Sequence, residues 1–153
     1  MTDPTIDAAR EILDEALVAM RASIVGATPD ELNRKPAGDD TNSIAVLATH
    51  SMNSTRWWLH VAIGAEPPVR DRPSEFLASA AGAAELLSFF DGMAADCRDV
   101  LAVDVAFDGG ALREREAEQT VTAAWALLHA LEHLREHVGH VELTRQLQAF
   151  DVS

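Results

Sequence analysis

Apolar residues recur every three or four positions in four long stretches of this chain, a spacing that places them on one side of an α-helix. The stretches run from Pro4 to about Gly26, from Asn42 or Ser43 to Gly64, from Ala83 to Leu101, and from Thr120 or Thr122 to about Phe150. Such helices must bury their apolar sides against one another. The pattern therefore predicts an all-α fold, an antiparallel four-helix bundle, with residues 1–153 forming a single domain.

The connections between these stretches carry residues that start or break helices. Asp3-Pro4 is a cap followed by a first-turn proline, Thr28 is a candidate cap for one further turn, and a turn is expected at residues 74–76. The longest irregular segment is VDVAFDGGALREREAEQ, whose Glu-rich end we expect to approach the last helix through solvent. A strand over VLAVDVAFD is the rival interpretation, but its alternation is poor and an isolated strand has no partner for its backbone.

The charge balance limits the partners of the protein. Twelve Lys and Arg against 25 Asp and Glu give a net charge of −13, which repels phosphate backbones and anionic lipids. We therefore expect no nucleic-acid or membrane partner, and the lack of a signal peptide or long apolar segment predicts a cytoplasmic location. The one cysteine, Cys97, excludes an internal disulfide and falls on an apolar helical stripe, where it is expected to pack as a small hydrophobe.

Four of the six histidines lie in HALEHLREHVGH, residues 129–140. On a helix this row adjoins the leucine stripe and lies largely away from the charged side. Protonated neighbouring imidazoles would repel one another, and neutral buried ones need a partner for each nitrogen. A metal ion solves both problems. His133 and His137 stand one turn apart and closest to the leucines, so they are the predicted pair of ligands.

A third ligand must come from another helix. His50 shares a face of the second predicted helix with Trp57, whereas His60 is rotated from it by roughly 80°. Three histidines from two helices bind one side of a divalent ion and leave positions open, which is typical of catalytic sites. The sequence thus predicts a metal site of His50, His133 and His137.

Four further residues are candidates for a supporting role at this site. His129 and His140 either support the ligands or belong to a polar rim. Asn53 and Trp57 share the side of the helix that carries His50. Trp57 either lines a pocket or packs in the core beside Trp58.

These residues stand in two segments that resemble the DinB-like superfamily of metal-binding four-helix bundles. LATHSMNSTRWWLHVAIGAEPP resembles its second helix, with a ligand histidine before an aromatic pair and a Gly/Pro-rich exit. LLHALEHLREHVGHVELTRQL resembles its last helix, with an H-x-x-x-H pair and then a glycine-polar step at Gly139-His140. By this resemblance the ligands are His50, His133 and His137, and His129 matches a histidine that is not usually a ligand.

The resemblance also implies cofactors and partners. Members bind a divalent ion, usually zinc or nickel, and often form homodimers. Characterised relatives include transferases that use a low-molecular-weight thiol such as mycothiol or bacillithiol, as well as isomerases and hydrolases. A metal-dependent thiol S-transferase acting on a small molecule is therefore the predicted function, and the thiol must come from a cofactor because Cys97 is not placed for that task.

Two other functions fit parts of the pattern. HALEH and HLREH match the H-x-x-E-H motif of zinc peptidases, in which Glu132 or Glu136 would be the general base. Both glutamates, however, lie roughly 60–100° from the histidine row on a helix. The second alternative is a non-enzymatic bundle that responds to metal or pH through its histidines.

Overall fold

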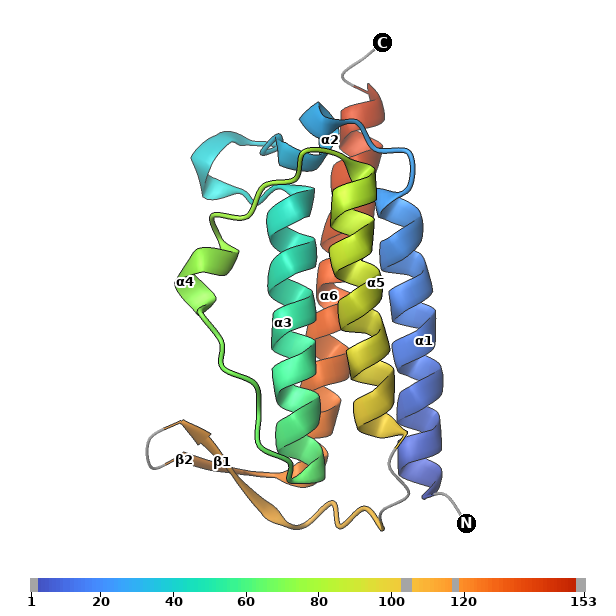
Figure 1. Cartoon of the computed structure of the whole chain (residues 1–153), viewed down its shortest axis with the longest axis vertical. Helices are drawn as coiled ribbons and strands as arrows, with labels where there is room; N and C mark the ends of the chain where they lie inside the picture. The colour runs from blue at the N-terminus through green and yellow to red at the C-terminus, as the bar shows by residue number, and fades with distance from the viewer. Residues whose placement is uncertain (1–2, 103–105, 117–118, 151–153) are drawn as a thin grey trace.

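Four long helices lie side by side in the computed structural model, which describes residues 3–102, 106–116 and 119–150 (Figure 1). They are α1 (Pro4–Ile24), α3 (Ile44–Ile63), α5 (Ala83–Leu101) and α6 (Ala123–Phe150). Three short helical turns occur in the connections, namely α2 (Pro29–Asn33), η1 (Gly38–Asp40) and α4 (Arg72–Glu75). The described chain is mostly helical, which confirms the predicted all-α class. None of its helices is long and apolar enough to cross a bilayer.

Helices α1, α2 and α3 begin where capping residues were identified in the sequence. The Asp3 carboxylate accepts a hydrogen bond from the first turn of α1, and Ser43 does the same for α3. Thr28 forms a reciprocal capping box at α2. Helix α3 ends at Gly64, whose φ of 75° lies in the left-handed region that favours glycine.

The direction of the helices differs in part from the prediction. Helix α3 runs opposite to α6, and α1 runs opposite to α5, but α3 and α5 run in the same direction (Figure 1). The reason is the connection of residues 64–82, which contains α4 and returns along the outside of α3 before α5 begins. Short links join antiparallel neighbours in a bundle, whereas this long link allows α3 and α5 to run in the same direction.

The predicted apolar stripes form the core. The apolar stripes of α1 and α6 are buried, and that of α5 is buried or half-buried. They consist of Ile6, Leu13, Leu17, Met20 and Ile24 in α1, of Leu127, Leu131, Leu134, Val138 and Val141 in α6, and of Ala83, Leu86, Leu87, Phe90, Met93, Cys97 and Leu101 in α5. Cys97 is also fully buried among them, as expected. The buried side chains of the four long helices include Leu13, Leu17, Leu59, Phe90, Leu127 and Leu134. This packing fixes the rotation of α3 and α6, and therefore where their histidines point.

A β-hairpin stands where the sequence predicted an irregular approach to the last helix. Strand β1 (Leu112–Glu116) pairs antiparallel with β2 (Gln119–Thr122). The prediction was wrong because the side of β1 that meets the helices carries arginines in place of apolar residues. Arg113 lies against Ala62 and Gly64, and the guanidinium of Arg115 lies over Trp58 and Trp125. The rival strand was placed over VLAVDVAFD, part of which, residues 103–105, lies outside the described residues.

Candidate metal centre

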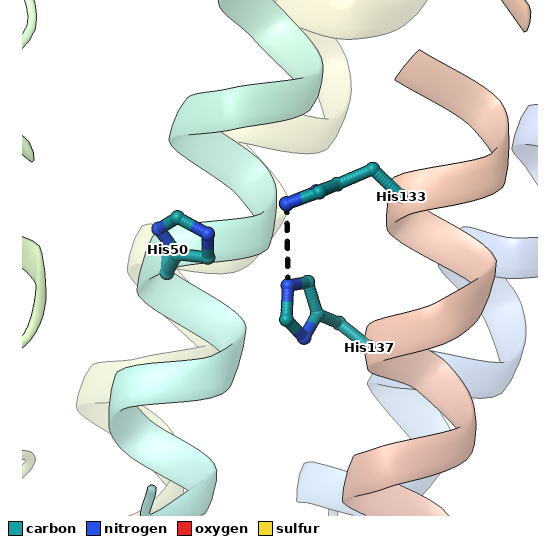
Figure 2. Close-up of side chains that lie close together, drawn as sticks. All are labelled: His50, His133 and His137. Atoms are coloured by element: carbon teal, nitrogen blue, oxygen red, sulfur yellow. Dashed lines mark hydrogen bonds between the residues drawn. The ribbon is translucent and has the colours of Figure 1, made fainter. Parts of the chain in front are cut away.

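Three histidine side chains from two facing helices converge between α3 and α6 (Figure 2). The ring centroid of His50 is 5.1 Å from that of His133 and 5.2 Å from that of His137. The Nε2 atoms of His133 and His137 are 3.3 Å apart, and one ring nitrogen of each of the three residues lies within 4.8 Å of the others. Within the described part of the chain, this is the group of side chains that could hold a metal ion.

Burial keeps these imidazoles neutral near pH 7. Desolvation, followed by repulsion from the neighbouring histidines, lowers the pKa of His133 to about 3 and that of His137 to about 4. Burial also lowers the pKa of His50, an effect that Arg70 and Arg72 strengthen and Glu75 opposes. A neutral imidazole offers a nitrogen lone pair, the form that binds a divalent ion.

The residues therefore fit a divalent ion. Three nitrogen donors face one space, and nitrogen is a ligand that zinc and nickel accept. His50 is buried, whereas His133 and His137 are half-buried, so one side of the group remains accessible. The arrangement can hold an ion on one side and leave positions open to a small ligand.

A buried carboxylate orients His50. Glu75 of α4 accepts a hydrogen bond from His50 Nδ1 at 2.9 Å, and only 4% of its side chain is exposed. Arg70 donates to both carboxylate oxygens, with Nε at 2.6 Å from Oε1 and Nη2 at 2.8 Å from Oε2. Because the carboxylate accepts at Nδ1, the lone pair of His50 lies on Nε2. The long connection between α3 and α5 thus supplies a partner that fixes one candidate ligand.

Sequence patterns did not identify Glu75 or Arg70. Both lie in VRDRPSEF, a proline-containing connection in which charged residues are ordinarily solvated. The turn expected at residues 74–76 corresponds to α4, but nothing in its local sequence shows that it folds back onto α3. Only the three-dimensional path of residues 64–82 brings this carboxylate to His50.

His129 and His140 flank the three-histidine group on either side. His129 stacks on Trp125 with centroids 4.7 Å apart, and its ring centroid lies 5.7 Å from that of His133. The Nδ1 atom of His140 is 3.3 Å from Nδ1 of His137, and His140 is exposed. Both side chains thus touch a candidate ligand.

The other candidates from α3, namely Trp57, Asn53 and His60, are not part of the three-histidine group. Trp57 lies edge-on to Trp58, with centroids 4.8 Å apart, and lines a hollow described below. Asn53 donates to the carbonyl of Thr49 in its own helix. His60 Nδ1 lies 2.8 Å from the carbonyl of Arg56 and is not in the three-histidine group.

Neither the glutamates of the peptidase motif nor the Cys97 thiol belongs to the three-histidine group. Glu132 and Glu136 of the H-x-x-E-H motifs are exposed, and neither belongs to the group that could hold a metal ion. Burial raises the pKa of the Cys97 thiol to about 12, so this side chain does not provide a thiolate at neutral pH.

We expect the metal-free protein to lose stability as the pH falls from 6.5 toward 4. The folded-state pKa values of about 3 for His133 and about 4 for His137 lie below the ordinary 6.5, so the unfolded chain binds more protons in this range. Because both side chains are partly exposed, the loss should be about 1 kcal/mol for each. Urea unfolding of chelator-treated wild type and His133→Gln measures it, and equal pH slopes for the two proteins would contradict the expectation.

A family model described as mycothiol-S-transferase matches residues 8–149. The chain belongs to the mycothiol S-transferase family. This is a DinB-like family, so the resemblance seen in the sequence is confirmed. No curated protein matches the chain.

A solved structure supports the fold. The chain is similar to a crystal structure of a conserved protein from Enterococcus faecalis, with a TM-score of 0.75 and 17% identity. The match covers 96% of this chain and 97% of the other. At this identity the similarity establishes the helical fold of this mycothiol S-transferase family member and nothing about its substrates.

Proposed function

We propose that the protein joins a low-molecular-weight thiol, through its sulfur atom, to a small electrophile at a divalent ion held by His50, His133 and His137. Mycothiol is the first candidate for the thiol, because of the family, and bacillithiol the second. Zinc or nickel is the proposed ion. The single observation that carries the proposal is the convergence of three neutral imidazoles on one partly accessible space.

The protein's own residues would bind the ion and hold it in position. His133 and His137 present Nε2 atoms toward the same space, and Glu75 holds the proton of His50 on Nδ1 so that Nε2 is free. A divalent ion in such a site lowers the pKa of a thiol that binds it and so supplies a thiolate nucleophile at neutral pH. Cys97 is buried with a raised pKa, so the reacting sulfur has to enter from outside the chain.

An assay of thiol consumption tests this function. The zinc- or nickel-loaded protein is mixed with mycothiol and monochlorobimane, and the fluorescent thioether is followed as the S–H proton and chloride are released. We expect the wild type to accelerate the reaction and His133→Ala to fall to the uncatalysed rate, because one of three ligands is lost. The matched control is His60→Ala, which should retain the wild-type rate.

Two outcomes would contradict the proposal. Equal rates for wild type and His133→Ala would remove the histidines from the reaction. If the wild type binds one ion but accelerates the reaction of neither mycothiol nor bacillithiol, the alternative is favoured, namely a metal- or pH-responsive binding bundle.

A further inference from the structure

A hollow of about 280 Å³ borders the candidate metal centre. Arg70 lines it, and Nη2 of the same arginine lies 3.4 Å from His50 Nδ1. The hollow is slightly smaller than most drug-sized ligand sites and suits one small aromatic molecule. Its other lining residues are Trp57, Trp58, Pro68, Val69 and Arg72.

The positive charge at this hollow is unusual for so acidic a chain. Most arginines of the described residues form ion pairs with carboxylates, and Arg70 is paired with Glu75. Arg72, by contrast, has no carboxylate within ion-pair distance among the described residues, and its guanidinium lies 5.9 Å from the ring centroid of Phe76. Arg115 also lacks such a partner in that part of the chain and lies 5.7 Å from the ring centroid of Trp58.

The aromatic wall connects the hollow to the histidines. The Trp58 ring centroid lies 4.9 Å from that of His129, which in turn neighbours His133. Phe76 lies 4.7 Å from His50 on the side of the connection. A planar molecule seated on Trp57 and Trp58 would therefore lie near His129, which is one helical turn from His133 of the three-histidine group.

We propose that this hollow binds the negatively charged, aromatic or otherwise planar electrophile of the reaction, with its anionic group at Arg72, which lines the hollow, and with Arg115 over the Trp58 ring adding positive charge nearby. The identification of this ligand as the electrophile rests on the proposed function. A guanidinium without an intramolecular counter-charge is free to bind a carboxylate or sulfonate. The acidic surface elsewhere repels such a group, so the arginines select the site as well as strengthen binding.

Tryptophan fluorescence tests the inference directly. Two of the three tryptophans of the chain, Trp57 and Trp58, line this hollow, and the ring centroid of the third, Trp125, lies 5.3 Å from that of Trp58. Quenching by 4-nitrobenzoate is compared with quenching by its uncharged counterpart 4-nitrobenzyl alcohol. Wild type should bind the carboxylate more tightly, and Arg72→Gln should weaken its binding about tenfold while changing that of the alcohol less than twofold.

Two further variants complete the experiment. Arg115→Gln should also weaken carboxylate binding. Arg21→Gln, which removes an exposed arginine of α1 that pairs with Asp91 of α5, should leave it unchanged. Equal affinity of the carboxylate for wild type and Arg72→Gln would overturn the proposal.

His133→Ala separates this inference from the proposed function. The variant should keep the Arg72-dependent binding of 4-nitrobenzoate even if it binds no metal. If His133→Ala abolishes carboxylate binding, the anion binds at the histidines and the inference is wrong. If the wild type binds the carboxylate but does not accelerate the thiol-consumption assay, the anion site stands and the transferase function fails.

Discussion

Replacing His133 with alanine is expected to lower zinc affinity at pH 7 by about 100- to 1000-fold. Structural zinc sites with four ligands contribute about 10–16 kcal/mol in total, so the loss of one ligand should cost about 3–4 kcal/mol. His50→Ala and His137→Ala should have effects of the same size, because the three imidazoles are placed alike around one space. Competition with a chromophoric chelator of known affinity gives the dissociation constants.

His60→Ala is the matched control for this series. The substitution removes a half-buried histidine of the same helix as His50. The ring of His60 bonds to the backbone carbonyl of Arg56 and is not part of the three-histidine group. We expect its zinc affinity to remain within twofold of wild type. Equal affinities for all four variants and the wild type would exclude the three histidines as ligands.

Replacing Glu75 with glutamine should lower zinc affinity by about 10- to 100-fold, although Glu75 is not itself a proposed ligand. The substitution keeps the size of the side chain but removes the charge that holds the His50 Nδ1 proton. It also leaves the guanidinium of Arg70, which is only 16% exposed, without its counter-charge. Breaking such a buried pair should cost about 3 kcal/mol of unfolding free energy.

Two measurements separate positioning from simple destabilisation. Zinc affinity is measured by chelator competition well below the temperature at which Glu75→Gln unfolds, and the unfolding free energy is measured in urea. The control Asp96→Asn breaks the exposed pair of Arg56 with Asp96 and should cost less than about 1 kcal/mol without changing affinity. Loss of stability in Glu75→Gln with unchanged zinc affinity would show that Glu75 only anchors the connection.

Helical periodicity predicted the parts of the molecule that local sequence determines. Apolar spacing predicted the four long helices and their buried stripes, and capping residues predicted where α1, α2 and α3 begin. The convergence of His50 with His133 and His137 could also be predicted, because each histidine's place on its helix relative to the core residues determines where it points once two helices pack. His60 could be set aside by the same argument.

The features that were not predicted depend on the path of the chain between helices. The parallel direction of α3 and α5 follows from the long connection of residues 64–82, whose course no periodic pattern encodes. The same course brings Glu75 to His50. The hairpin was missed because Arg113 and Arg115, and not apolar residues, occupy the side of β1 that meets the helices.

The most direct test of the three-histidine centre is to identify the nitrogen atoms that bind zinc. Long-range proton–nitrogen NMR of ¹⁵N-labelled protein resolves both ring nitrogens of each histidine as one equivalent of zinc is added. The geometry predicts that the Nε2 signals of His50, His133 and His137 shift together, while those of His60 stay unchanged. A zinc-saturated protein in which any of these three Nε2 signals remains unshifted would contradict the centre described here.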